Sequence, residues 1–122
     1  QKGISSYVEF VGVVKDVDRY LAQSKIFAFV STSEGFPNAL GEAVLFPTAS
    51  ISYNCPAGPE DIIRDDENGF LVPLGKVEEY ATKLKMLMES EELRTRFEMN
   101  AVSDRSKYSM ENIGESFFNF MF

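Results

Sequence analysis

Short apolar runs alternate with more polar segments along the first part of the chain. Four of these runs have the length and side-chain content of β-strands: 7–14 (YVEFVGVV), 26–31 (IFAFVS), 49–53 (ASISY) and 70–72 (FLV). The run 26–31 is nearly unbroken, which is typical of a parallel strand that is covered on both faces. The pattern therefore predicts four strands, of which 26–31 and 49–53 are buried.

Helices are predicted between these strands. Residues 16–24 place apolar side chains three and four positions apart, and Asp16 or Asp18 can cap that helix. A second helix is expected over residues 37–46, because proline is tolerated in a first helical turn and Pro47 disfavours continuation. Each of these helices connects two predicted strands, as in a βα unit.

The remainder of the chain is predicted to be mostly helical. A short helix at 60–64 follows a Pro/Gly loop at 55–59, and from Val77 onward the apolar residues keep a helical period. Further helices are expected around Phe97 and from Ser109. Strands that alternate with helices favour right-handed crossovers, so we expect an α/β fold with a parallel sheet, flanking helices and a helical C-terminal third.

Length and charge narrow the classes of protein that the chain can be. The 122 residues, 44% of them hydrophobic, are enough to bury about two-thirds of the unfolded surface. We therefore expect one domain or one piece of a larger domain. The net charge is −7 and the longest positive run is only KLK at 83–85, so no nucleic-acid partner is expected.

Side chains that common catalytic and metal sites require are missing from the sequence. It has no histidine, which excludes a histidine base, a Ser-His-Asp triad and a histidine metal site within the chain. Its one cysteine, Cys55, is expected to fill space in a protein from a reducing compartment. The acidic run 65–67 is expected to be solvated and not to bind a metal ion. The sequence shows neither a membrane-spanning run nor a signal-peptide pattern.

Residues 31–44 (STSEGFPNALGEAV) place Glu34 and Glu42 on either side of a Gly-Phe-Pro-Asn turn. In an open α/β sheet, ligands bind beyond the carboxyl ends of the strands, where this turn is predicted to lie. The first amides of a helix stabilise a phosphate, and Gly35 permits a close backbone approach. Glu34 can accept hydrogen bonds from sugar hydroxyls. Glu42, on the same helical face as Asn38, can accept them from a diol such as a ribose.

This arrangement resembles the signature of glycosyltransferase family 4, in which two glutamates are separated by seven residues. Members of that family are retaining nucleotide-sugar transferases with two Rossmann-like domains, the GT-B architecture. The stretch 24–43 (SKIFAFVSTSEGFPNALGEA) resembles the family's strand, loop and helix. The stretch 51–73 (ISYNCPAGPEDIIRDDENGFLVP) is similar to the loop and strand that follow. The resemblance implies a Rossmann-like parallel sheet.

The resemblance also implies a role for each matching residue. Glu34, as the catalytic residue, would hold the donor sugar, and Glu42 would hold the ribose. The sugar and the diphosphate would contact the segment between them, which comprises Gly35, Phe36, Pro37, Asn38, Ala39 and Leu40. The nucleobase would lie against the backbone around Val14. From the residues alone, Phe36 can equally pack on the core as a staple, and Asn38 can equally cap the helix.

The resemblance further implies that residues 1–122 are part of a donor-binding domain. Family members bring an Arg and a Lys to the diphosphate from the first βα unit of this domain, and the chain has no match for them. That unit and the N-terminal acceptor-binding domain are expected to be absent from this chain, which lacks an initiator Met. The fragment alone is therefore expected to be inactive. Its tail, 117–122 (FFNFMF), is expected to cover the acceptor-binding domain in preference to a membrane.

The implied function is transfer of a hexose from a nucleotide diphosphate sugar, with a UDP-sugar favoured, to a glycan or lipid-linked acceptor, with retention of the anomeric configuration. No cofactor and no metal are expected. The resemblance favours bacterial surface-polysaccharide synthesis in the cytoplasm, at the inner face of the membrane, with peripheral membrane contact of the intact protein.

A non-catalytic binding or assembly module that keeps the fold is an open alternative. A receiver-type signalling domain is a third, which Asp65 and Asp66 disfavour because they lie in a predicted turn.

Overall fold

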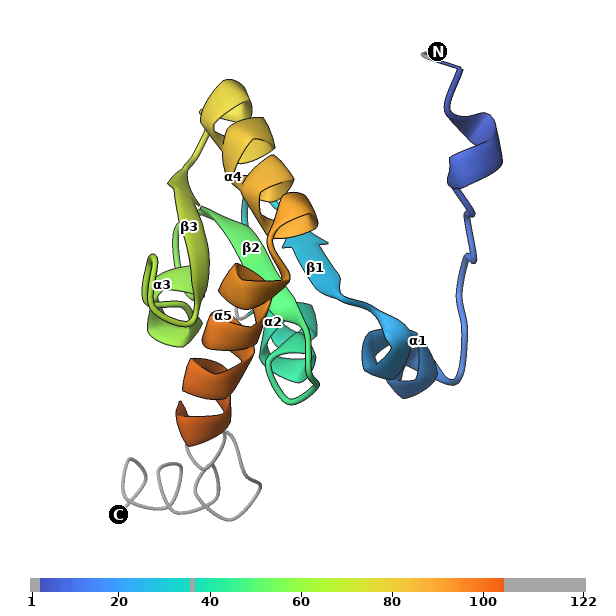
Figure 1. Cartoon of the computed structure of the whole chain (residues 1–122). Coiled ribbons are helices and arrows are strands. Elements are labelled where there is room, and N and C mark those ends of the chain that lie inside the picture. The colour runs from blue at the N-terminus through green and yellow to red at the C-terminus, as the bar shows by residue number, and fades with distance from the viewer. Residues whose placement is uncertain (1–2, 36, 105–122) are drawn as a thin grey trace.

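A three-stranded parallel sheet forms the centre of the structure, a computed structural model that describes residues 3–35 and 37–104 (Figure 1). The strands follow one another across the sheet in chain order and comprise β1 (Ile26–Phe29), β2 (Ala49–Asn54) and β3 (Gly69–Pro73). Because the strands are parallel, each connection returns from one end of the sheet to the other. The carboxyl ends of all three strands therefore lie at one edge.

Helices make these crossovers and cover both faces of the sheet. Figure 1 shows α4 and α5 on one side of the sheet and α2 and α3 on the other. In the described residues the α-helices are α1 (Val17–Gln23), α2 (Asn38–Ala43), α3 (Pro59–Ile62), α4 (Val77–Glu89) and α5 (Glu91–Asp104). The predicted α/β fold, with a parallel sheet and flanking helices, is confirmed.

The core consists of two apolar layers, one on each face of the sheet. Under α4 and α5, Ile51 and Phe70 pack with Leu87 and Phe97. The rings of Phe70 and Phe97 meet edge to face, with their centroids 4.9 Å apart. On the opposite face, Leu40 of α2 is fully buried among residues of α3 and β1. Successive residues of a strand point to opposite faces, so the central strand β2 is buried on both, as predicted.

Strand β1 is less buried than its sequence predicts. Among the described residues it pairs with β2 alone, which makes it an edge strand. Ala28 is exposed, and the other residues of β1 are only partly buried. The expectation that 26–31 is covered on both faces is therefore wrong for the described structure, because no second neighbour lies beside β1.

Tyr80 ties α4 to the sheet close to the carboxyl end of β1. Its hydroxyl lies 3.3 Å from the carbonyl oxygen of Phe29 and 3.2 Å from that of Ile51, so it can donate to either. Burial, together with the neighbouring Tyr53, raises the pKa of Tyr80 to about 12. The hydroxyl therefore stays protonated at neutral pH and anchors the end of β1.

The predicted strand at 7–14 does not form. Ser5–Tyr7 make one 3-10 turn, η1, and the residues that follow it as far as Asp16 lack regular structure. Phe10 and Val13 are 95% and 105% exposed, and Figure 1 shows this segment running apart from the sheet. A strand is stable only when its backbone groups pair with a neighbouring strand. None of the described residues provides that neighbour.

The predicted helices of the first half form with shifted ends. Asp16 is the N-cap residue of α1, although its side chain makes no capping bond. Helix α2 is shorter than the predicted 37–46, because the chain turns after Ala43 and the Thr48 hydroxyl donates to the Ala43 carbonyl over 2.8 Å. Helix α3 begins at Pro59, one residue before its predicted start.

Other predictions concern single residues and the end of the chain. Cys55, expected to fill space, is 2% exposed directly after β2, which confirms that expectation. The helix expected from Ser109 and the tail 117–122 lie outside the described residues. Within the part of the chain that the structure describes, no helix has the length and apolarity to cross a membrane.

Candidate functional site

The segment with the two glutamates lies beyond the carboxyl end of β1, as the sequence predicts. Strand β1 ends at Phe29, the following turn contains Glu34 and Gly35, and α2 begins at Asn38. Glu42 lies within α2, about one turn after Asn38. The two glutamates therefore flank the start of α2, at the edge of the sheet where open α/β folds bind ligands.

The N-terminus of α2 has no side-chain cap. Its N-cap residue is Pro37, which makes no capping bond, and its first turn contains no acidic residue. Within residues 37–104, the first helical bond of α2 runs from the Gly41 amide to the Pro37 carbonyl over 3.0 Å. The amides of Asn38, Ala39 and Leu40 precede this bond and have no partner within the helix. These N–H groups and the positive end of the helix dipole can hold an anion.

Glu34 is half-buried, and Ser31 holds its carboxylate. The Ser31 hydroxyl donates to Oε1 of Glu34 over 2.7 Å, and it also lies 3.1 Å from the carbonyl oxygen of Ser33. Because Ser31 follows the end of β1 after one intervening residue, this bond links the carboxylate to the sheet. Sequence reasoning missed Ser31. The only signal for it was a hydroxyl three residues before the glutamate.

The exposed side of α2 carries Asn38, Ala39 and Glu42. The Leu40 side chain is fully buried in the core, so only the backbone of Leu40 can face a ligand. Because Pro37 and not Asn38 is the N-cap residue, the alternative in which Asn38 caps the helix is wrong. Glu42 and Asn38 do lie one turn apart on the exposed side, where the sequence placed them.

A glycine in the loop after β2 determines where Pro37 lies. Gly58 has a φ of +134°, and a Cβ at this position would be 2.2 Å from Cδ and 2.8 Å from Cγ of Pro37. Only glycine fits there, so the loop after β2 packs tightly against the start of α2. Sequence reasoning missed this contact, because it identified only a Pro/Gly loop. Phe36, beside Pro37, lies outside the described residues, so both interpretations of it stay predictions.

Val14 is the remaining residue that the sequence assigned to the site. It is half-buried and lies in the segment between η1 and α1 that has no regular structure. The strand on which its assignment rested is absent from the described structure. Its place beside a nucleobase therefore stays a prediction.

The acidic run before β3 is exposed, as predicted, and is also paired. Asp66 Oδ1 lies 2.9 Å from Nη2 of Arg96, and Glu67 Oε2 lies 2.7 Å from Nε of Arg64. Arg64 also contacts Asp104 of α5 over 2.6 Å, and the hydrogen bonds to Glu67 and Asp104 raise the pKa of Arg64. These contacts join the turn to α5. Of the pairs, Arg64–Glu67 and Arg96–Asp66 are exposed and each contribute little stability, whereas the Asp104 carboxylate is mostly buried.

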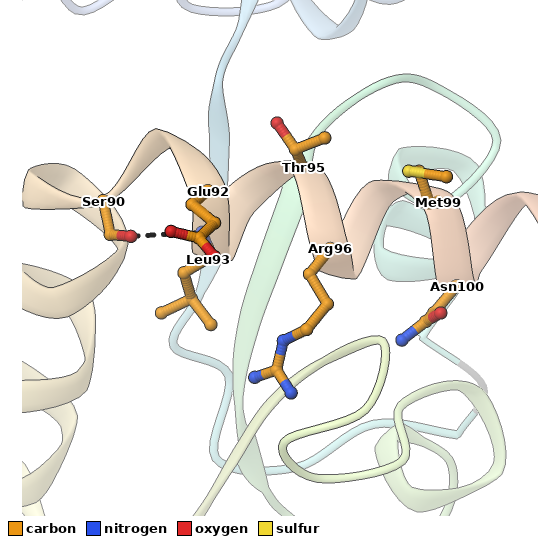
Figure 2. Close-up of a pocket in the computed structure, with 7 residues that line it drawn as sticks. All are labelled: Ser90, Glu92, Leu93, Thr95, Arg96, Met99 and Asn100. Carbon is orange, nitrogen blue, oxygen red and sulfur yellow. Dashed lines mark hydrogen bonds between the residues drawn. The ribbon is translucent and has the colours of Figure 1, made fainter.

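A separate pocket of about 560 Å³ lies on α5 (Figure 2). Among the described residues it is lined by Ser90, Glu92, Leu93, Thr95, Arg96, Met99 and Asn100. Two of its polar groups already bind the protein, since Arg96 pairs with Asp66 and the Asn100 side chain donates to the Glu67 carbonyl over 2.7 Å. No residue of 34–42 lines this pocket. The candidate site therefore stays at the start of α2.

Comparison with known protein sequences finds relatives over most of the chain. The family model described as glycosyl transferases group 1 matches residues 1–104. The amylovoran biosynthesis glycosyltransferase AmsD of Erwinia amylovora is 33% identical over 105 residues, which are 86% of this chain and 29% of AmsD. The chain thus spans less than a third of this curated relative.

Solved structures show the same arrangement of elements. A mutant of TarM from S. aureus, in complex with fondaparinux, alpha-GlcNAc-glycerol and UDP, aligns with a TM-score of 0.84 and 28% identity over 97% of this chain and 24% of TarM. The C-terminal domain of the glycosyl transferase group 1 family protein LpcC from Francisella tularensis aligns with a TM-score of 0.72 and 31% identity, over 84% of this chain and 53% of that domain. The fold therefore matches that of a glycosyltransferase C-terminal domain.

Proposed function

Because the chain belongs to the glycosyl transferases group 1 family, we propose that it is the donor-binding part of a retaining family 4 glycosyltransferase with the GT-B architecture. The observation that carries this proposal is the uncapped N-terminus of α2, flanked by two glutamates at the carboxyl edge of a parallel sheet. The enzyme would move a hexose to a glycan or lipid-linked acceptor with retention. The UDP in the TarM structure supports a UDP-sugar as the donor.

In this proposal the diphosphate rests on the amides of Asn38, Ala39 and Leu40. A helix end stabilises an anion by about 0.3–1 kcal/mol per charge, or about 2 kcal/mol when partly buried. The chain's net charge of −7 opposes the binding of a diphosphate. Basic residues from the rest of the enzyme are therefore part of the proposal, as is an acceptor-binding domain. Residues 1–122 alone, as a partial donor domain, are proposed to be inactive.

The two glutamates bind different hydroxyl groups of the donor. Glu34, held on the turn, accepts hydrogen bonds from the donor sugar, and Glu42, exposed on α2, accepts them from the ribose diol. A Cβ at Gly35, between them, would have no atom within 4 Å, which leaves the backbone open to a ligand. Phe36 flanks the donor, and the nucleobase lies near Val14. Bond breaking is assisted by electrostatic stabilisation of the leaving diphosphate.

The proposed setting is bacterial surface-polysaccharide synthesis. The relative AmsD is named for amylovoran biosynthesis, which supports a polysaccharide pathway. A nucleotide-sugar donor implies that the site faces the cytoplasm. A lipid-linked acceptor implies peripheral contact of the intact enzyme with the inner face of the membrane.

Titration of the intact enzyme with UDP, followed by calorimetry, tests the role of Glu42. Glu42→Ala removes the charged acceptor without harming the helix, since alanine is a good helix former. Hydrogen bonds to a charged group are worth about 1.5–3 kcal/mol, so we expect the Kd for UDP to rise at least about tenfold. The matched control is Glu89→Ala, which removes a carboxylate that is 67% exposed on α4.

The outcomes separate the alternatives. An unchanged Kd in Glu42→Ala removes the ribose role, and a failure of the unaltered enzyme to bind UDP favours the non-catalytic module. NMR of the product's anomeric proton tests retention, and we expect the same configuration as in the donor. An inverted product contradicts the family 4 assignment.

A further inference from the structure

We propose that Ser31 is a positioning residue that orients the Glu34 carboxylate toward the donor sugar. This inference rests on the proposed function, because it assigns to Ser31 a task that exists only if Glu34 binds the sugar. Ser31 lies before the first glutamate of the signature, so the motif itself assigns no role to it. The hydrogen bond between the Ser31 and Glu34 side chains is the observation that points to one.

The hydrogen bond is short and partly shielded from water. It joins Ser31 Oγ to Glu34 Oε1 over 2.7 Å in a part-buried position. At neutral pH a carboxylate only accepts hydrogen bonds, so the serine hydroxyl must be the donor. Hydrogen bonds to an ionised acceptor are about twice as strong as neutral ones, and partial burial strengthens them further. The bond is therefore strong enough to select one orientation of the glutamate.

Glu34 needs such a restraint because its own backbone restrains the side chain only weakly. It lies in a turn between β1 and α2 that has no regular structure, and the next residue, Gly35, is exposed. A glutamate side chain has several rotatable bonds, and ordering it costs conformational entropy. The bond from Ser31 orders the side chain before the donor arrives. It engages Oε1 and leaves Oε2 to accept from a sugar hydroxyl.

Ser31 is itself held by the sheet. It follows β1 after one intervening residue, and the carbonyl oxygen of Phe29, the last residue of β1, lies 3.3 Å from the Tyr80 hydroxyl. The serine can also turn its hydroxyl toward the Ser33 carbonyl, but that contact is longer, at 3.1 Å. The Glu34 carboxylate is charged and closer, so it is the preferred acceptor.

The test compares UDP with the complete UDP-sugar in the intact enzyme, because only the sugar reaches Glu34. For Ser31→Ala we expect kcat/KM for the donor to fall about tenfold while the Kd for UDP stays within about twofold. Ser31→Thr keeps the hydroxyl and should restore most of the activity. The matched control is Ser33→Ala, which removes a neighbouring exposed hydroxyl and leaves the Ser33 carbonyl in place.

Combining the change with Glu34→Ala isolates the coupling between the two residues. If Ser31 acts through Glu34, the double variant should be no worse than Glu34→Ala alone. Full activity of Ser31→Ala overturns the inference, and so does an equal loss of UDP binding and donor turnover, which would mean a structural role. Full activity of Glu34→Ala, by contrast, contradicts the proposed function itself.

Discussion

The N-termini of α2 and α5 are built in opposite ways. At the start of α5, the Ser90 hydroxyl accepts a hydrogen bond from the Leu93 amide over 3.1 Å, and Glu91 and Glu92 occupy the first turn. At the start of α2, Pro37 provides no side-chain cap, and the first turn has no acidic residue. Among the described residues, the start of α5 has a side-chain cap and first-turn acids, whereas the start of α2 has neither.

The remaining described helices share only the first-turn acids with α5, because α1, α3 and α4, like α2, make no side-chain capping bond. Every α-helix in the described residues except α2 has at least one acidic residue in its first turn. Each such charge stabilises a helix by about 0.3–1 kcal/mol. Helix α2 lacks that stabilisation in a chain with 19 acidic residues. In the proposed function, the negative charge that complements α2 is supplied by the donor's diphosphate, whereas the other described helices carry theirs in their own first turns.

Placing an acidic residue in the first turn of α2 should remove this difference between α2 and the other helices. We expect this change to have the largest effect of all, a loss of UDP affinity. Ala39→Glu puts a carboxylate on an exposed position beside the proposed diphosphate. We expect UDP affinity to fall at least about tenfold, and to fall further at low salt, because like charges repel. The same change should leave the free energy of unfolding unchanged or raise it by about 0.3–1 kcal/mol.

The opposite signs of the two effects make this prediction specific. Ala39→Gln has nearly the same size without the charge, so calorimetry with this variant shows whether bulk alone weakens binding. If Ala39→Glu binds UDP as tightly as the unaltered enzyme, the diphosphate does not lie at the start of α2.

Removing the cap of α5 should have a smaller effect and only on stability. Ser90→Ala leaves the Leu93 amide without its acceptor, so we expect denaturation to show a loss of about 1 kcal/mol. Ser90→Asp restores an acceptor and should recover most of this loss. The Kd for UDP should not change in either variant, and a weaker affinity in Ser90→Ala would mean that the two helix ends are not independent.

A similar contrast between two apolar runs shows what the sequence can and cannot predict about the fold. The runs 7–14 and 49–53 both have the composition of strands, yet only the second forms one, as β2. β2 has a neighbour on each side, whereas the described residues offer none to 7–14. Local composition reports the preference of a segment for strand structure. Whether the strand forms depends on a pairing partner, which is distant in the sequence. For the same reason, the burial of β1 was overestimated.

The candidate site was predictable to a similar degree. The motif and the order of strand, turn and helix were enough to place Glu34 and Glu42 on either side of the start of α2. The contact of Gly58 with Pro37 was not predictable, because it depends on how two loops pack. The bond from Ser31 to Glu34 depends on side-chain rotamers, which neither spacing nor periodicity reports.

A crystal structure of the intact enzyme with UDP tests the central claim most directly. The quantity to measure is the distance from the diphosphate oxygens to the backbone nitrogens of Asn38, Ala39 and Leu40. We predict at least one N–H···O hydrogen bond of about 2.7–3.2 Å to these amides, with the Glu42 carboxylate on the ribose diol. A diphosphate bound elsewhere, with the start of α2 in contact only with water, would contradict the account.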